Sequence, residues 1–532
     1  LNFLVREEQR PHGTVEVKRM ATHVVDLLDL MPNLPLLLSL SLFLLLLFPF
    51  LKLLTSKPPP PRKLPPGPPK LPFIGNLHQL LGELPHRALR RLSDQYGPLM
   101  HLHLGAAPAL VVSSAEMAQQ VLRTHDLFFC SRAPLISAVK LSYGRVDMAG
   151  APYDEGLKQT RKLCTSEMFS ASKVESSRPI REEEVGVLVS TIARRSSSGP
   201  VNLSEMFFCL FNDITRRQVS GRRASREGEC SVSPLNDLLL EINIVLGGFS
   251  LGDVFPNMAW LNKLTGWQAR LDKTFRDVDR FLEEEIAMHV ADGGKDDDTF
   301  IATLLRLQDD PSLGPLLTRD RIKAILLDMF GGGSGSSMAT LEWAMSELMT
   351  NPIAMKKAQE EVRSVVGTKE SVDEEDLRRL HYLKLVVKET WRLHPPGPLL
   401  IPRECREDCK IGDYHVAAKT WVFVNVWWIM RDPKNWREPE AFLPERFEDG
   451  SINYKGQHFV LLPFGSGRRI CPGMALGELG VELTLANLLH RFDWEIPDGL
   501  GKDGFDMGEA LALANHRSSP LLLKATSWST TP

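Results

Sequence analysis

The chain has 532 residues, of which 43% are hydrophobic and 24% are charged, and its formal net charge is −3. A balance so close to neutral excludes the usual nucleic-acid binder, whose domain carries a strong basic excess, so we predict no nucleic-acid partner. No long polar linker or repeat interrupts the chain after about residue 72, which favours one large domain over several small ones.

The N-terminal part of the sequence predicts a membrane anchor. Residues 34–51 are uncharged and almost wholly Leu and Phe, and about 18 residues at about 1.5 Å rise span roughly 27 Å, enough for a thin bilayer. Because Lys52 and Lys57 follow this run and no small-residue cleavage site does, we predict a transmembrane helix over residues 34–54, with a cleaved signal peptide as the alternative. Residues 1–19 are charged and patternless, so we interpret them as an upstream extension and Met20 as the true start.

A proline-rich tether follows the anchor. Its prolines exclude a helix or a central strand, so we predict a stiff hinge over residues 55–72, one large domain over residues 73–526 and a tail over residues 527–532. Asn202 begins an Asn-Leu-Ser sequon, which stays unmodified if that domain faces the cytosol.

Helical periodicity dominates the predicted domain. Residues 316–367 and 373–393 repeat apolar and charged positions at a spacing of three to four. Only residues 100–112 and 420–426 have the composition of short strands. We therefore predict a mainly α fold with a small β region.

The helical stretch 316–367 contains an unusual glycine cluster. Gly331, Gly332, Gly333 and Gly335 follow one another with a single interruption, and each costs about 1 kcal/mol relative to alanine inside a helix. We predict a local widening or kink there, and a linker between two helices is the alternative.

A pair of opposite charges and a proline-rich run come next. Glu389 and Arg392 are three positions apart and share a helix face, so they are able to pair; an ordinary surface ion pair is the alternative. Four prolines keep residues 394–403 out of a helix.

Cys405 and Cys409 have the spacing of half a metal site, but no second ligand pair lies near them. The seven scattered cysteines indicate a reducing compartment.

The most specific motif lies at residues 464–473, which read FGSGRRICPG. The glycines let backbone N–H groups approach the Cys471 sulfur, and the arginines supply the positive surroundings that a thiolate ligand needs. This pattern predicts a haem-thiolate site with Arg469 beside a haem propionate. The alternative is a cysteine that is merely buried in a glycine-rich turn.

The chain resembles the cytochromes P450 from about residue 64 to about residue 524, and within them the plant 71-clan of microsomal enzymes. Glu389 and Arg392 match the family's Glu-x-x-Arg motif, and residues 444–447 match its Pro-Glu-Arg-Phe motif. The cysteine-ligand loop has every fixed residue of the family pattern, namely Phe464, Gly467, Arg469, Cys471 and Gly473.

The resemblance implies a cytochrome P450 fold that holds haem b, with Cys471 as the axial ligand of the iron. It implies that Arg446 joins Glu389 and Arg392 in a buried ionic triad with a structural role. The other cofactor-binding residues that it implies are Arg161, Arg403 and Arg469 on the propionates, together with Phe464, Gly473 and Gly332.

Two positions depart from the family pattern. In the family, an acid and a threonine in the oxygen groove relay protons; Gly335 and Ser336 stand at their places, beside Gly333. A serine hydroxyl still holds a water, but glycine supplies no proton, and the loss of one acid–base group raises a barrier by roughly 3–5 kcal/mol. The tryptophan expected four residues before Arg161 is Leu157, which has no N–H to donate to a propionate.

The resemblance implies a monooxygenase that inserts one atom of O2 into a small apolar plant metabolite, whether terpenoid, phenolic or indolic. Electrons would come from NADPH through a separate cytochrome P450 reductase, since the sequence has no flavin or nicotinamide fingerprint. The implied location is the endoplasmic reticulum membrane, single-pass, with a cytosolic catalytic domain. The alternative is a haem-binding fold with impaired or non-oxygenase activity, through rearrangement or peroxide use, because of Gly335. The substrate-pocket residues implied are Leu399, Leu400, Ala510 and Leu511.

Overall fold

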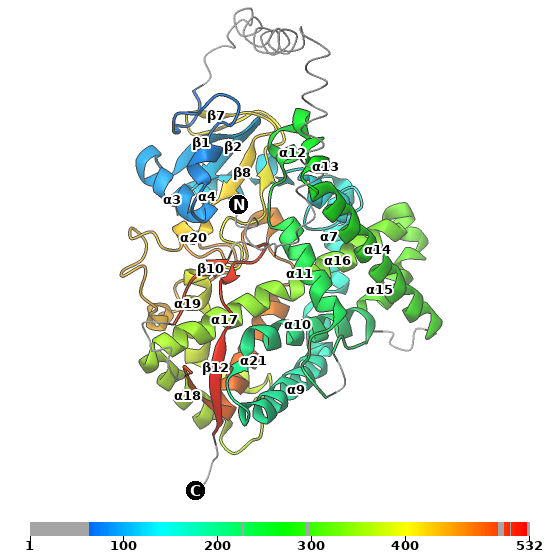
Figure 1. Ribbon diagram of the computed structural model, residues 1–532, viewed down its shortest axis with the longest axis vertical. Helices are drawn as coiled ribbons and strands as arrows, with labels where there is room; N and C mark the ends of the chain where they lie inside the picture. The colour runs from blue at the N-terminus through cyan, green and yellow to red at the C-terminus, as the bar shows by residue number, and fades with distance from the viewer. Residues whose placement is uncertain (1–62, 226–227, 294–297, 498–504, 511, 529–532) are drawn as a thin grey trace, which may run out of the picture. The chain divides into compact units, whose positions relative to one another are not determined.

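The computed structural model describes residues 63–225, 228–293, 298–497, 505–510 and 512–528 (Figure 1). Apart from Lys63, these residues belong to one unit that begins at Leu64. The predicted extension (1–19), the predicted anchor (34–54), residues 55–62 of the predicted hinge and residues 529–532 of the predicted tail lie outside the described residues. Within the described ranges, no helix has both the length and the apolar character needed to cross a bilayer.

Helices make up most of the unit, and many begin at a residue whose side chain accepts a hydrogen bond from the first turn. Asp154 caps α7 through the Leu157 N–H at 2.8 Å, and Thr318 caps α16 through the Arg321 N–H at 3.2 Å. The first helices in the chain are η1 (Leu77–Leu80), α3 (Pro85–Tyr96), α4 (Ala115–Gln119), η2 (Gln120–Thr124), α5 (Asp126–Phe129), α6 (Ile136–Leu141), α7 (Glu155–Glu167), α8 (Ala171–Ser176), α9 (Arg178–Ser196), α10 (Leu203–Ser220), α11 (Pro234–Leu246), α12 (Leu251–Val254), η3 (Pro256–Met258), α13 (Leu261–Leu264) and α14 (Trp267–Ala291).

The remaining helices carry the predicted motifs. They are α15 (Phe300–Gln308), η4 (Pro311–Leu316), α16 (Arg319–Gly333), α17 (Gly335–Thr350), α18 (Pro352–Val366), η5 (Asp376–Arg379), α19 (His381–Leu393), α20 (Val426–Ile429), η6 (Pro444–Phe447), η7 (Gly467–Arg469) and α21 (Met474–Arg491).

Short strands form four small sheets in the described part of the chain. The largest sheet has the order β1 (Leu99–Leu104), β2 (Ala107–Val112), β8 (Trp421–Val424), β5 (Arg403–Glu404) and β3 (Ser131–Arg132); only β2 and β8 pair in parallel. In this sheet Arg132 stands opposite Arg403. The other sheets are β4 (Val201–Asn202) with β12 (Leu522–Ser527) and β9 (Phe492–Glu495), β6 (Cys409–Ile411) with β7 (Tyr414–Val416), and β10 (Glu509–Ala510) with β11 (His516–Arg517).

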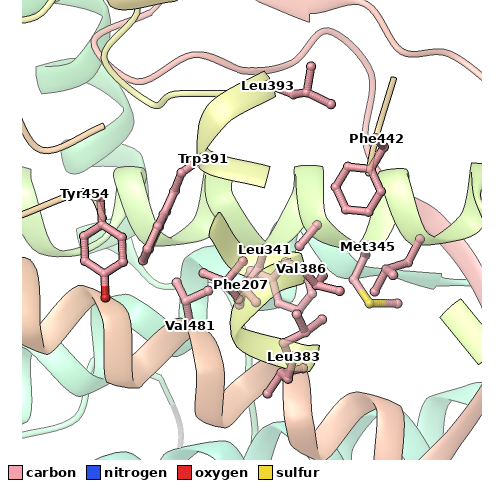
Figure 2. Close-up of a cluster of buried hydrophobic side chains, with 14 of the residues drawn as sticks. Phe207, Leu341, Met345, Leu383, Val386, Trp391, Leu393, Phe442, Tyr454 and Val481 are labelled. Carbon is pink, nitrogen blue, oxygen red and sulfur yellow. The ribbon is translucent and has the colours of Figure 1, made fainter. Parts of the chain in front are cut away.

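The main hydrophobic core joins helices from distant parts of the chain. Figure 2 shows Phe207 of α10, Leu341 and Met345 of α17, Val386 of α19 and Val481 of α21 in one cluster. All five side chains are buried, and burial of such side chains stabilises the fold by about 1.5–3 kcal/mol each. This packing holds α17 and α21, which flank the predicted site, in fixed positions.

The predicted fold class is confirmed, since the described residues are mainly helical with a small β part. The details differ from the prediction at several boundaries. Residues 100–112 form two strands rather than one, because Gly105 turns the chain with a φ of +61°. The second helical stretch begins at His381 rather than at residue 373.

The helix is interrupted at the glycine cluster, where a widening or kink is predicted, and this interruption is called the kink below. Helix α16 ends at Gly333 and α17 begins at Gly335, with Ser334 between them. Ser334 keeps right-handed helical angles, and the Met338 N–H donates to its carbonyl at 3.0 Å. The two helices therefore meet at a single residue, and no linker separates them.

Candidate functional site

The loop before α21 has a backbone that only glycine accommodates. Gly465 and Gly467 have φ values of +70° and +71°. A Cβ on Gly467 would lie 2.3 Å from the Leu122 carbonyl oxygen, far inside any allowed contact. The Cys471 N–H donates to the Phe464 carbonyl at 3.0 Å, which closes the loop. The local sequence thus fixes where the Cys471 side chain points.

Cys471 combines an exposed surface with a thiol that protein surrounds. Its surface is exposed, yet protein surrounds the thiol closely enough that burial raises its pKa above the usual value. A hydrogen bond from the Gly473 N–H and the positive charge of Arg161 act in the opposite direction and favour the thiolate. A sulfur that is enclosed by protein and still open on one side is able to ligate a metal.

Phe464 anchors the loop to the core. Its ring makes an edge contact with Trp391 at 4.9 Å between centroids, and Tyr454 lies 5.7 Å away. Trp391 belongs to α19 and Tyr454 to the segment that leads to the loop. Aromatic contacts of this kind add about 0.5–1.5 kcal/mol beyond burial, so they hold the loop against α19.

Three predicted arginines converge beside the loop. Arg161 of α7 donates to the Ile470 carbonyl at 2.8 Å. Arg469 donates through Nε to the Cys130 carbonyl at 2.6 Å, and Arg403 of β5 donates to the Ser466 carbonyl at 3.0 Å. The structure therefore brings Arg161, Arg403 and Arg469 together, as the sequence predicts.

A fourth arginine joins these three, and no sequence pattern predicts its place in the site. Arg132 of β3 is buried opposite Arg403 and donates to the Ile401 carbonyl at 2.6 Å. Burial and the charges of Arg403, Arg469 and Arg161 hold its pKa well below the usual value. A lone arginine in a two-residue strand has no sequence signal of its own; only its pairing with β5 reveals it.

The nearby carboxylates do not neutralise all the positive charge of the arginine cluster. Burial, then the charges of Arg161 and Arg403, lowers the pKa of Arg469 to about 10. Asp126 pairs with Arg403 at 3.1 Å, but Arg403 Nε is buried and has no hydrogen-bond partner among the residues that the structure describes. Buried cations that destabilise one another favour an anionic ligand, so these residues fit the propionates of a haem whose iron faces Cys471.

Asp126 is a second residue that the sequence did not single out. One carboxylate oxygen accepts from Arg403, and the other accepts from the Arg468 backbone N–H and guanidinium, both at 3.0 Å. Asp126 thus ties the ligand loop to α5, more than 340 positions earlier in the chain. No local pattern indicates a contact over that distance.

The ionic triad has the predicted geometry. Glu389 pairs with Arg392 at 2.7 Å and with Arg446 at 3.0 Å, and the side chains of Glu389 and Arg392 are fully buried. Arg392 also donates to the carbonyls of Met430, Pro439 and Ala441, which lie in the segment before the ligand loop. This excludes a surface ion pair and locks that segment onto α19.

The glycines at the kink face different surroundings. Apart from the backbone of its own helix, a Cβ on Gly331 or on Gly332 would meet no atom of the described residues within 4 Å. A Cβ on Gly333 would lie 2.7 Å from the Thr215 hydroxyl of α10. The direction that a side chain on Gly333 would take is therefore toward α10 and not toward the open space beside Gly332. Gly333 was expected to line the oxygen groove. Instead, the absence of a side chain at Gly333 lets α16 pack closely against α10.

Ser336 and Gly335 follow the kink. The Ser336 hydroxyl donates to the Gly332 carbonyl at 2.9 Å, so its oxygen keeps both lone pairs for accepting. A Cβ on Gly335 would lie 3.6 Å from both amide atoms of Asn243 and 3.9 Å from the Ala514 Cβ. No carboxylate stands at this position, as the sequence indicates.

The expected substrate-pocket residues take separate places. Leu400, with a φ of +53°, lies 3.6 Å from the position of a Cβ on Gly465 and packs against the main core. Its neighbour Leu399 packs instead against the cluster under the β1–β2 sheet. Ala510 lies in β10, and Leu511 is outside the described residues. The two leucines therefore point to different sides of the chain.

A comparison with known families decides the identity. The profile described as cytochrome P450 matches residues 65–522, nearly the whole described unit. The chain belongs to the cytochrome P450 family. The match runs through the arginine cluster, the kinked helix, the triad and the Cys471 loop.

Curated plant P450s are similar over most of their length. Cytochrome P450 71A1 of Persea americana is 48% identical over 85% of this chain and 91% of its own. Strychnine-11-hydroxylase of Strychnos nux-vomica is 45% identical over 87% of this chain and 92% of its own. Premnaspirodiene oxygenase of Hyoscyamus muticus is 44% identical over 92% of this chain and 98% of its own. The predicted resemblance to plant 71-type P450s is confirmed.

The family establishes the class of chemistry. This P450 is a monooxygenase, an oxidoreductase that incorporates molecular oxygen, with haem as its cofactor and a reductase as its source of electrons. Nothing in the comparisons supports the alternative of a fold without oxygenase activity. The individual roles of the site residues stay predictions.

Proposed function

We propose that this P450 is a microsomal enzyme that inserts one oxygen atom of O2 into a small apolar plant metabolite, of terpenoid, phenolic or indolic type. The observation that carries the proposal is the open-sided Cys471 thiol in a glycine-fixed loop beside three buried arginines and the half-buried Arg161. The printed names of two similar proteins, a strychnine hydroxylase and a premnaspirodiene oxygenase, support a small plant metabolite as substrate.

We propose haem b as the cofactor, with Cys471 as the axial ligand and with Arg161, Arg403 and Arg469 on the propionates. When bound, the haem accepts electrons and activates O2, so that one oxygen atom enters the substrate and the other leaves as water. Arg132 adds a fourth charge to the same side. Leu157, buried at the start of α7, contributes packing but no N–H bond to a propionate.

The protein's part in the chemistry is to hold charge and protons at fixed atoms. The Gly473 N–H and Arg161 stabilise the Cys471 thiolate against the effect of burial. The Ser336 hydroxyl, directed at the Gly332 carbonyl, offers its lone pairs to a water in the open space beside Gly332. A water held there replaces part of what an acid at position 335 would do.

The electron partner and the location complete the proposal. NADPH–cytochrome P450 reductase supplies the electrons, since no dinucleotide fingerprint occurs in the sequence. The apolar run at residues 34–54 supports a single-pass anchor in the endoplasmic reticulum membrane, with the catalytic domain in the cytosol.

The decisive experiment is a carbon monoxide difference spectrum of the reduced protein, expressed from Met20 in microsomes. A red-shifted Soret band of the thiolate type is expected, and it should disappear in Cys471→Ser. The matched control is Cys409→Ser, because Cys409 is also a free cysteine but lies in β6. A wild-type protein without haem, or a thiolate band that survives in Cys471→Ser, would contradict the assignment.

The topology is tested by the sequon at Asn202. Asn202 is half-buried and caps α10 through the Glu205 N–H at 3.3 Å. We expect no glycan there when the chain starts at Met20. A version that is forced into the lumen by a cleavable secretory signal is the control, since its Asn202 meets the glycosylation machinery during synthesis. An endoglycosidase-sensitive glycan on the chain that starts at Met20 would overturn the cytosolic orientation.

A further inference from the structure

An amide side chain fills the place beside Gly335 that the missing acid leaves. A Cβ on Gly335 would lie 3.6 Å from both Nδ2 and Oδ1 of Asn243, an ordinary contact distance. Asn243 lies in the last turn of α11 and is half-buried, so its amide approaches the kink from a neighbouring helix. The Ala514 Cβ, at 3.9 Å, bounds the same spot and carries no polar atom.

The Asn243 amide is anchored but not saturated. Its Nδ2 donates to the Leu239 carbonyl at 2.9 Å, which fixes the orientation of the amide on α11. In the described part of the chain, no donor bonds to its Oδ1. An amide has two N–H donors and an oxygen with two lone pairs, so one donor and the acceptor oxygen remain for a water.

Asn243 and Ser336 border the same opening. Gly332, Gly335 and Ser336 are spaced i, i+3 and i+4, which places them on one helix face. The Ser336 hydroxyl confirms the continuity of that face by donating to the Gly332 carbonyl at 2.9 Å. Because a Cβ on Gly332 would meet none of the described residues within 4 Å, the space next to both polar groups is open in this part of the structure.

We propose that Asn243 is a positioning residue that holds a water beside Ser336, from α11, in place of the acid that position 335 lacks. The inference rests on the proposed function. Asn243 Oδ1 accepts a hydrogen bond from the water, and the water's second O–H points into the open space beside Ser336. An amide does not ionise, so the proton comes from the water and is restored from solvent; Asn243 sets only the position of the water.

The test uses the carbonyl stretch of the reduced, carbon monoxide-bound holoenzyme, measured by infrared spectroscopy in H2O and in D2O. A water that donates to the bound carbon monoxide lowers the stretching frequency and makes it sensitive to D2O. We expect both effects in the wild-type protein. Asn243→Leu should raise the frequency and abolish the sensitivity, whereas Asn243→Asp, which keeps an acceptor oxygen, should retain it.

Two controls distinguish a role of Asn243 in positioning the water from a role in packing the helices. Ile244→Ala alters the next residue of α11, whose side chain is exposed, and should leave the infrared band unchanged. The double variant Gly335→Asp/Asn243→Leu places a carboxylate at the family position and should restore the D2O sensitivity. The midpoints of thermal unfolding of Asn243→Leu and Ile244→Ala should agree, which excludes a general loss of structure.

The outcomes distinguish the two proposals. If the wild-type protein shows no thiolate-type Soret band, the proposed function fails and this inference fails with it. If that band is present but the carbonyl stretch is insensitive to D2O, or stays sensitive in Asn243→Leu, only the role of Asn243 is refuted.

Discussion

At the scale of single residues, Gly467 is the position where the site tolerates least change. Its φ of +71° and the Leu122 carbonyl at 2.3 Å from a Cβ leave no room for alanine. We expect Gly467→Ala to express with little haem and no thiolate-type Soret band. Gly450→Ala is the matched control, because Gly450 has a φ of +66° with nothing within 4 Å, so only the backbone cost of about 1–3 kcal/mol applies. Equal haem content in the two variants would show that the close approach does not matter.

The triad makes a second residue-scale prediction. Glu389→Ala leaves Arg392 buried without its partner, and breaking a buried pair costs about 3–5 kcal/mol. Urea unfolding should show a large drop in the midpoint. Glu360→Ala, which removes one member of the exposed pair with Lys356 at 3.7 Å, should change the free energy of unfolding by less than about 1 kcal/mol. A similar loss in both variants would mean that the triad acts as an ordinary surface pair.

At the scale of elements, the glycines at the kink between α16 and α17 differ in role. Helix packing requires some of them to be glycine and tolerates a side chain at others. Gly331→Ala adds a methyl group to open space and removes a poor helix former, so it should stabilise the protein by up to about 1 kcal/mol. Gly333→Ala should destabilise it, because the new methyl group collides with Thr215 at 2.7 Å. Thermal unfolding of the holoenzyme measures both effects. The double variant Gly333→Ala/Thr215→Ala should recover most of the loss; if it does not, another contact sets the requirement for glycine.

Helix α21 carries a buried acid that makes stability depend on pH. Burial, and then the negative charge of Glu478, raises the pKa of Glu482 from 4.5 to about 8. The unfolded chain releases this proton near pH 4.5 and the folded chain only near pH 8, so the stability contributed by Glu482 falls as the pH rises between those values. Glu482→Gln removes the ionisation, and its advantage in unfolding midpoint over wild type should grow from about pH 6 to about pH 8. An advantage that stays constant with pH would contradict the raised pKa.

The same elements show what the sequence determines locally and what it leaves to tertiary packing. The cysteine loop, the Glu389–Arg392 spacing and the kink are predictable because glycine conformation and helix periodicity act over a few residues. Arg132, Asp126 and Asn243 are not predictable, because each reaches the site through a contact with a distant element: β5, the ligand loop and the kinked helix. The direction in which a side chain on Gly333 would point is not predictable for the same reason, since only the position of α10 decides whether that direction is blocked.

At the scale of the whole described unit, the hydrophobic clusters are joined rather than separate. Adjacent residues of α10 serve different clusters: Phe207 lies in the main core and Phe208 in a second cluster, while Met338 packs against both. The hydrogen bond between His86 and Glu509 at 2.9 Å further joins positions 423 residues apart. Helix α10 is buried along 14 of its 18 residues, so it transmits a loss of packing in one cluster to the other cluster. We therefore expect the unit to unfold in one cooperative transition.

Phe208→Leu tests this cooperativity. The substitution weakens the second cluster, against which Trp267 packs, whereas Trp391, Trp436 and Trp494 lie in the main core. In a Trp267→Phe background, intrinsic fluorescence therefore reports on tryptophans outside the changed cluster. If the clusters unfold together, the fluorescence and far-ultraviolet circular dichroism melts of the variant shift downward by the same amount. Phe207→Leu, at the neighbouring position in the main core, should produce the same coincident shift. A fluorescence melt that stays at the wild-type midpoint while the dichroism shifts would mean that α10 joins two independently unfolding parts.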